Sequence, residues 1–371
     1  MTIPLARPEI TEDDVAAVVG VLRSDRLALG PKLAAFEEAI AAYVGVRHAV
    51  AVNSGTSALH VLVRSLGLGD GDEVITTPFS FIASTNCILF ERARPVFVDI
   101  DPVTLCIDPE RIEAAITPRT KAILAVDVFG HPADWRTLER IAESHGLLLI
   151  EDSAEALGSE LDGHRCGAFG RAGVFGFYPN KQITTGEGGV LVTDDEELAD
   201  VCRSLADQGR GDGGWLSHVR MGYNYRLDEM SAALGLSQLA RLEEIVADRA
   251  RVAGWYLDAL AGVEGLELPS VQPGVRMSWF VFVVQLAGEF ARADRDRVLR
   301  HLLAQGIECR NYFQPIHLQP YIRELLGTKE GDFPVTESVG DRSISLPFYN
   351  QLTCESVDRV AVALRRAVRC G

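Results

Sequence analysis

Lys181 stands in a segment whose residue types favour a tight, ordered loop. The segment FGFYPNKQITTGEGG (175–189) starts like a strand, turns at Pro179, and ends in three glycines around one glutamate. A lysine that acts as a nucleophile needs a desolvated, shaped site, and such a loop can supply one. Taken alone, however, most lysines after a strand are ordinary solvated side chains.

A second candidate segment is VNSGTSALH (52–60), which follows the apolar run HAVAV. Gly55 permits a tight turn, and Thr56 and Ser57 open a helix whose free N–H groups and dipole suit a phosphate. The alternative is a plain N-cap, in which Ser54 or Thr56 only satisfies the helix donors. The GxxxxGK spacing of a nucleotide-binding P-loop is absent.

The third candidate is Asp152, in the segment LLLIEDSAEALGS (147–159), just past an apolar run that predicts a buried strand. A carboxylate at the end of a buried strand needs a partner, which could be a cation such as a protonated ring nitrogen. The alternative is that Asp152 caps the next turn. Both interpretations stay open on this segment alone.

The order of these segments along the chain indicates that they serve one site. Pyridoxal phosphate (PLP) needs a phosphate site, a carboxylate opposite its ring nitrogen and a lysine for a Schiff base. Gly55, Asp152 and Lys181 supply these in turn, and TPFSFIAST (77–85) adds Phe79 and Phe81 as aromatic faces. We therefore predict a PLP site.

The elements that position these residues alternate between short apolar runs and helical stretches from residue 48 onward. This pattern predicts an α/β fold with a mainly parallel sheet that binds ligands at the carboxyl ends of its strands. Thr11 and Asp14 predict a capping box. An amphipathic helix is expected to run from the LDEMSAALG segment to Leu260, and SWFVFVVQL (278–286) to form a strand. We predict a large domain (1–245) and a smaller C-terminal α+β domain (246–371), with the N-terminal segment free to pack on the latter.

Composition narrows the functional classes. The net charge of −16 disfavours a nucleic-acid surface, and the seven cysteines show no CxxC pair. No signal peptide is visible and no apolar run reaches membrane-spanning length. We expect a cytoplasmic protein that binds no nucleic acid, membrane or metal.

The segments IEDSAEALGS, FYPNKQITTGEGG and GYNYRLDEMSAALGLSQL, together with similarity over nearly the whole chain, resemble the DegT/DnrJ/EryC1/StrS aminotransferases. This resemblance implies PLP as cofactor and the aspartate-aminotransferase type of fold (fold type I). It implies that Lys181 forms the Schiff base and moves the substrate proton, while Asp152 pairs with the pyridinium nitrogen. The other implied cofactor contacts are Gly55, Thr56 and Ser57 at the phosphate, Phe81 over the ring, Glu155 near the ring, and Asn224, which reaches the cofactor of the partner subunit in a homodimer.

Two positions depart from the family pattern. Gly176 replaces a serine that helps bind the phosphate. Glu155 replaces a glutamine or histidine, so two anionic acceptors would meet at the cofactor's phenolic oxygen. Glu155 is then expected to be protonated, or turned towards a substrate hydroxyl or an arginine.

The resemblance implies transfer of an amino group from glutamate to a nucleotide-linked keto-sugar. Candidate substrate contacts are Tyr178, Arg220, Arg226, Tyr312 and His317, the last equally well explained as a structural histidine. A sugar dehydratase of the same family is disfavoured because that branch carries histidine where Lys181 stands. A carbocyclic ketone (inosose or aminoshikimate type) remains an alternative substrate, and a non-catalytic PLP-binding regulator an alternative function.

Overall fold

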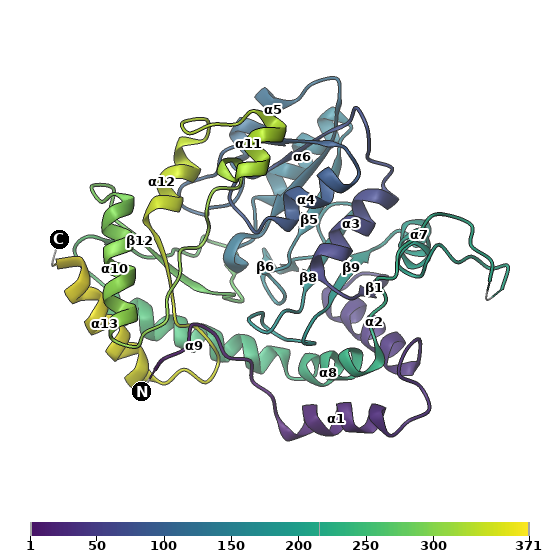
Figure 1. The fold of residues 1–371 in the computed structure, drawn as a ribbon, viewed down its shortest axis with the longest axis horizontal. Helices are drawn as coiled ribbons and strands as arrows, with labels where there is room; N and C mark the ends of the chain where they lie inside the picture. Colours follow the sequence, from purple (N-terminus) through teal and green to yellow (C-terminus); the bar gives the residue numbers. More distant parts are fainter. Residues whose placement is uncertain (1, 215, 370–371) are drawn as a thin grey trace.

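The computed structural model describes residues 2–214 and 216–369. A central sheet has seven strands in the order β1-β9-β8-β5-β4-β2-β3 (Figure 1). Neighbouring strands from β8 to β3 are parallel, and β9 is antiparallel to both β8 and β1. This sheet confirms the predicted α/β class. Its strands are β1 (His48–Val52), β2 (Glu73–Thr76), β3 (Arg94–Phe97), β4 (Thr120–Val126), β5 (Leu148–Asp152), β8 (Ala172–Gly176) and β9 (Gly189–Thr193).

Helices cover both faces of the sheet because its side chains alternate between two cores. Val50 and Leu191 share a core with the helices α3 and α7, whereas Ala51, Val192 and Phe175 pack with α2 and α8. The helices of this part are α2 (Pro31–Val44), α3 (Gly55–Ser65), α4 (Ala83–Phe90), η1 (Pro109–Arg111), α5 (Ile112–Ala115), η2 (Val128–Gly130), α6 (Trp135–His145), α7 (Glu196–Ala206) and α8 (Glu229–Leu239).

The C-terminal part contains an antiparallel sheet in the order β10-β12-β13, and a third sheet has the order β11-β6-β7. Their strands are β6 (Glu160–Leu161), β7 (His164–Arg165), β10 (Leu266–Glu267), β11 (Val275–Arg276), β12 (Phe282–Leu286) and β13 (Ser343–Leu346). The helices are α9 (Leu242–Leu260), α10 (Arg292–Ala304), η3 (Ile316–Leu318), α11 (Pro320–Leu326), α12 (Pro334–Arg342) and α13 (Cys354–Arg369). None of the helices in the described ranges, α9 included, is long and apolar enough to cross a membrane.

The largest core cluster is continuous from the central sheet to the C-terminal sheet, since it holds both Val50 and Phe282. The predicted domain division at residue 245 falls inside α9 and stays a prediction. The N-terminal segment lies along the C-terminal part: the Ile3 amide donates to the carbonyl of Gly306 (2.8 Å), and the amide of Glu308 donates to Ile3 (3.0 Å).

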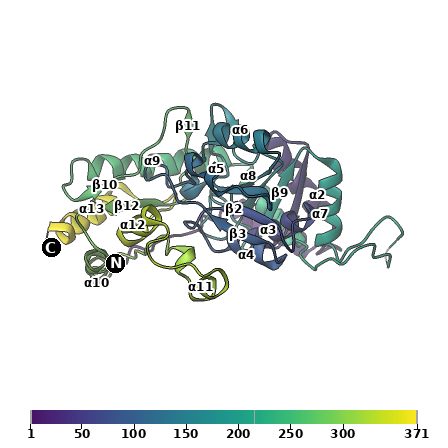
Figure 2. The same cartoon turned by 90° about the horizontal axis from the view of Figure 1, so that it is seen from above.

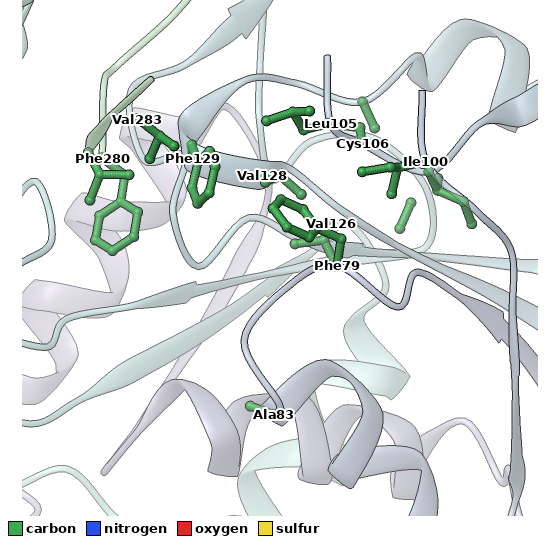
Figure 3. Packing of buried hydrophobic residues seen from close by; sticks show 14 of the residues in the cluster. Phe79, Ala83, Ile100, Leu105, Cys106, Val126, Val128, Phe129, Phe280 and Val283 are labelled. Carbon is green, nitrogen blue, oxygen red and sulfur yellow. The ribbon is translucent and has the colours of Figure 1, made fainter. Parts of the chain in front are cut away.

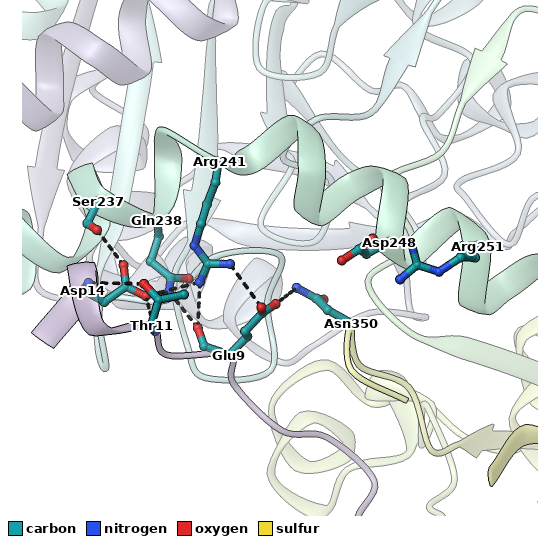
Figure 4. A network of polar contacts seen from close by, with 9 residues as sticks. All are labelled: Glu9, Thr11, Asp14, Ser237, Gln238, Arg241, Asp248, Arg251 and Asn350. Atoms are coloured by element: carbon teal, nitrogen blue, oxygen red, sulfur yellow. Dashed lines mark hydrogen bonds and ion pairs between the residues drawn. The ribbon is translucent and has the colours of Figure 1, made fainter. Parts of the chain in front are cut away.

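The predicted helix towards Leu260 is two helices, so the expectation of one continuous helix is wrong. α8 ends at Leu239 and α9 begins at Leu242. Arg241 leaves the helical conformation (φ −116°, ψ 18°) and donates to the Glu9 carbonyl (2.9 Å) and the Asp14 carboxylate (3.2 Å) (Figure 4). Asp14 also closes the predicted capping box with Thr11, which the structure confirms. The break thus docks α1 (Glu12–Leu22) under α8.

The run SWFVFVVQL is strand only from Phe282 to Leu286. Trp279 has a left-handed backbone (φ 55°), which extended strands exclude, so the residues before 282 turn away from the sheet. The expectation of one long strand is wrong here, and the turn carries Phe280 towards the cavity described below.

Candidate active site

A cavity of about 650 Å³ lies at the carboxyl ends of the parallel strands, where such sheets bind ligands. Its walls come from the start of α3, the turn before α4, the end of β5, the segment after β8, and the loops at 280 and 311–313. Among its lining residues are eight of the residues singled out in the sequence: Gly55, Thr56, Phe81, Asp152, Glu155, Tyr178, Lys181 and Tyr312.

The start of α3 forms one end of the cavity. Ser54 is the N-cap: its hydroxyl accepts the amide of Ser57 (3.0 Å), and the Ser57 hydroxyl donates to Asn53 (2.7 Å). The amide and the hydroxyl of Ser57 therefore both make hydrogen bonds within the helix start, whereas Gly55 and Thr56 border the cavity. The N-cap and the anion site are thus compatible, because they use different donors of the same helix end.

Gly176 lies against this helix start. A Cβ on Gly55 would sit 3.4 Å from the Gly176 Cα, so the two glycines pack closely. A Cβ on Gly176 would meet the Ala154 Cβ at 3.6 Å, an ordinary van der Waals contact. The Cβ of the serine that is usual in the family would therefore fit at this position.

The Lys181 side chain is only 14% exposed and its amine has two neighbours. Nζ lies 3.6 Å from Glu155 Oε1 and 3.8 Å from the ring centroid of Phe280, a cation–π geometry. Burial lowers the pKa of Lys181, and the negative charges of Glu155 and Asp152 oppose that shift. The amine is therefore nearer to its neutral, nucleophilic form than a solvated lysine.

Glu155 links Lys181 to a strained turn. Its Oε2 accepts the amide of Phe129 (2.8 Å), a residue held in the left-handed region (φ 58°). Figure 3 shows the Phe129 ring between Phe280 and Val128 in the buried core. Burial raises the pKa of Glu155, which the charge of Lys181 and the Phe129 amide oppose. This residue faces the lysine, so the structure supplies the positive neighbour that a carboxylate needs there.

Asp152 ends β5 and is buried, with 4% of its surface exposed. Its Oδ1 accepts the amide of Ala154 (3.1 Å), so it does cap the following turn. Burial raises the pKa of Asp152, while the Ala154 amide, the Ser84 hydroxyl and the charge of Lys181 work in the opposite direction. Because it also lines the cavity, Asp152 is placed to meet a cation there.

Six predicted residues do not line the cavity of this chain: Ser57, Phe79, Arg220, Asn224, Arg226 and His317. Phe79 is fully buried, and its ring packs against that of Phe129 (6.0 Å between centroids). Arg226 pairs with Asp207 (2.6 Å). His317 is fully buried beside Glu337 (2.9 Å), and burial lowers its pKa despite that carboxylate. Its position fits the structural interpretation of this histidine.

Arg220 and Asn224 lie on the segment between α7 and α8, which projects from the body at the right of Figures 1 and 2. Asn224 is exposed, and its backbone forms an isolated antiparallel β-bridge with that of Asp207 at the base of this segment. We call residues 207–214 and 216–225 the arm. Its outer part exposes Leu216, Val219 and Met221, which are 76%, 59% and 69% exposed. Such an apolar surface is typical of a protein contact.

The sequence reasoning missed several cavity residues, namely Ser84, Asn180, Phe280, Asn311 and Phe313. Asn180 directly precedes Lys181, and Ser84 lies in the same segment as Phe81, so their positions in the sequence are a signal for both. Phe280 carried no local signal, because it lies within an apolar run that resembles a strand. Only its left-handed neighbour Trp279 turns it to the lysine.

The cavity and the sheet around it together define a PLP-dependent enzyme of the aspartate-aminotransferase type. The chain belongs to the DegT/DnrJ/EryC1/StrS aminotransferase family, whose model matches residues 8–365. It is 41% identical to GDP-perosamine synthase of Caulobacter vibrioides over 91% of this chain and 90% of that protein. It is 31% identical to Helicobacter pylori PseC, an aminotransferase of pseudoaminic acid biosynthesis, with a TM-score of 0.95 and full coverage (100%) of both chains. Spr1654 of Streptococcus pneumoniae, solved in its PLP form, is 28% identical with a TM-score of 0.96, over 100% and 99% of the two chains.

The residues present fit PLP. A helix N-terminus opens on one end of the cavity, a buried carboxylate stands at the end of β5, and a buried amine has a lowered pKa. PLP needs groups of these three kinds for its phosphate, its ring nitrogen and its aldehyde carbon.

Replacing Glu155 by glutamine is expected to lower the pKa of Lys181 further, because an opposite charge near the amine is removed. Trace acetylation of the cofactor-free full chain at graded pH measures this, with Lys32, Lys121 and Lys329 as internal references. Glu187→Gln changes an exposed carboxylate of the same cavity and is the control. An unchanged or raised midpoint for Lys181 in Glu155→Gln would contradict the ion pair.

Proposed function

We propose that this aminotransferase converts a nucleotide-linked keto-sugar into an amino-sugar, with glutamate as amino donor. The observation that carries the proposal is the buried Lys181 amine in one cavity with Asp152 and the start of α3. The similarity to GDP-perosamine synthase and to PseC supports a sugar as acceptor. Lysine at position 181, rather than histidine, favours amino transfer over dehydration.

Bound PLP supplies an electron sink that makes a proton on the substrate carbon acidic. In the proposed roles, Gly55 and Thr56 bind its phosphate through the amides at the start of α3, which the helix dipole favours. Asp152 holds the ring nitrogen in its protonated form, since a buried carboxylate needs a cationic partner. Phe81, 61% exposed at the cavity, covers the ring face.

Lys181 is the proposed acid and base. It removes a proton from one carbon and returns it to another, so it must exist in both protonation states near neutral pH. Catalysis of this kind is most effective when the pKa lies close to the working pH. Burial moves the Lys181 pKa in that direction.

Four polar residues of the cavity wall are proposed to bind the acceptor. Tyr178, Asn180, Asn311 and Tyr312 all line the cavity and offer hydroxyl and amide groups suited to sugar hydroxyls. The side-chain Oδ1 of Asn180 is buried and lacks a hydrogen-bond partner within the described residues. A buried acceptor of this kind is satisfied when a substrate hydroxyl donates to it.

We propose a homodimer with shared active sites, in which Asn224 and Arg220 of the arm serve the partner's cavity. The support is that both residues lie outside the cavity of their own chain, on a projecting arm with exposed apolar side chains. Arg220 would bring a positive charge to anionic substrates in a chain of net charge −16.

Lys181→Ala is expected to reduce amino transfer from glutamate by about 10²–10⁴-fold or more, because the proposed acid and base is removed. The purified variant should also lose the yellow absorbance band that bleaches when glutamate is added to the native enzyme. Lys329→Ala, an exposed lysine, serves as the control. Near-native turnover of a panel of nucleotide-linked keto-sugars by Lys181→Ala would refute the role proposed for Lys181. If the native enzyme turns over carbocyclic ketones and none of these sugars, the proposed substrate class is wrong.

Glu155→Gln is expected to retain the cofactor through purification, because the amide still accepts the Phe129 N–H and presents no anion to the cofactor's phenolic oxygen. The ratio of cofactor absorbance to protein after gel filtration measures this. Asp152→Asn, which removes the proposed partner of the ring nitrogen, is the comparison and should hold the cofactor less tightly. Isolation of Glu155→Gln as cofactor-free protein would overturn this expectation.

Co-expression of Lys181→Ala and Asn224→Ala chains tests the shared sites. In a mixed dimer, the cavity of the Asn224→Ala subunit has its own lysine and receives Asn224 of the partner subunit, so one native site forms. Activity at limiting PLP should therefore exceed that of either variant alone. If dimers shown by mass to be mixed recover no activity, Asn224 does not act in the cavity of the partner subunit.

A further inference from the structure

Arg249, on α9, is a buried arginine that touches the backbone of two loops at once. The residue is only 3% exposed. Nη1 donates to the carbonyls of Trp279 (3.2 Å) and Phe280 (3.3 Å). Nη2 donates to the carbonyls of Asn180 (3.4 Å) and Lys181 (2.9 Å). One guanidinium thus ties the lysine loop to the loop that carries Phe280.

The charge of Arg249 is compensated in an unusual way. Its four acceptors within the described ranges are all carbonyl oxygens, and burial lowers its pKa to about 10. It therefore remains a cation at neutral pH, inside the protein, bound to peptide dipoles. A buried charge without a direct counter-charge is costly, so its retention calls for a specific use.

The contacts of Arg249 close a ring around the lysine amine. The Phe280 amide donates to the Phe129 carbonyl (3.2 Å), and the Phe129 amide donates to Glu155 (2.8 Å). Glu155 pairs with Lys181 Nζ (3.6 Å), which also lies over the Phe280 ring (3.8 Å). The Lys181 carbonyl then returns to Arg249. Each member is held by its two neighbours.

Two members of this region are held in sparsely populated backbone conformations. Phe129 (φ 58°) and Trp279 (φ 55°) are both left-handed without being glycine. A Cβ on Gly130, which follows Phe129, would sit 3.2 Å from the Phe280 amide nitrogen, so the two loops approach closely. Strained residues of this type persist only where their surroundings over-determine them, and they cluster at active sites.

We propose that Arg249 is a positioning residue for amino transfer: its guanidinium fixes the Lys181 and Phe280 loops so that the amine stays against the aromatic ring and beside Glu155. The inference rests on the role proposed for Lys181. Arg249 does not line the cavity and acts only through these loops.

The sign of the effect on Lys181 separates Arg249 from Glu155. The charged groups that act on Lys181 are Glu155, Asp152 and Arg249; the two carboxylates raise its pKa and Arg249 lowers it. Loss of Arg249 removes a neighbouring cation and also releases the amine towards water. Both changes favour the ammonium form. Release also weakens the pair with Glu155, which acts in the opposite direction, but burial is the largest influence on this amine, so the pKa of Lys181 rises.

Trace acetylation of the cofactor-free full chain at graded pH tests this, with Lys32, Lys121 and Lys329 as references. In Arg249→Met the Lys181 midpoint should rise by about one pKa unit, which makes acetylation about tenfold slower below the midpoint. Arg249→Lys keeps the charge, but its compact ammonium cannot span both loops, so a smaller rise is expected. If Arg249→Met does not fold, Arg249→Lys decides the question.

Arg295→Met is the matched control. Arg295, on α10, is also buried (5% exposed) and also binds a carbonyl, that of Gly340 (3.0 Å), but it lies outside the ring. Its loss should leave the Lys181 midpoint unchanged even if the thermal midpoint of unfolding falls.

The proposal is wrong if the Lys181 midpoint stays native in folded Arg249→Met or Arg249→Lys. It is also wrong if that midpoint rises equally in Arg295→Met. These outcomes are independent of the proposed function, because labelling reports the surroundings of Lys181 whether or not it carries catalysis. Failure of the function would instead appear as near-native turnover in Lys181→Ala.

Discussion

The burial of one amine is the constraint on which the rest of this site depends. Lys181 is 14% exposed, yet an ammonium is stabilised by water far more than by a protein interior. The structure compensates with an aromatic face from Phe280 and a carboxylate from Glu155, which keep the amine in place while burial lowers its pKa. A nucleophile and a proton carrier near neutral pH follow from that balance.

The same constraint explains how distant segments meet. Glu155 balances the amine only because a left-handed Phe129 presents its amide to the second oxygen. Phe280 reaches the amine because Trp279 leaves the strand conformation, and Arg249 on α9 binds the carbonyls of both loops. The continuous core between the two main sheets holds these loops in register. The chain departs from the family at both ends of the cavity: Gly176 lies at the phosphate end, and Glu155 at the lysine end, where its carboxylate pairs with the amine.

Much of the fold was predictable because it depends on local pattern. The alternating apolar runs predicted the strands of the parallel sheet, and Thr11 with Asp14 predicted the start of α1, as the structure confirms. The failures have tertiary causes. The break at Arg241 arises from contacts with Glu9 and Asp14, more than two hundred residues away in sequence. The strand that begins only at Phe282 is shortened by a turn that serves the cavity.

The sequence by itself determined the chemical groups and their order: a helix N-terminus, an acid after a buried strand, and a lysine on a glycine-rich loop. Parallel strands bring their carboxyl ends to one edge, so such residues converge whatever the details of packing. Only the tertiary structure decided that Glu155 faces Lys181, that Phe280 lies beneath the amine, and that Arg249 joins their loops. Those contacts depend on how separate segments of the chain pack together, which no local pattern of residues reports.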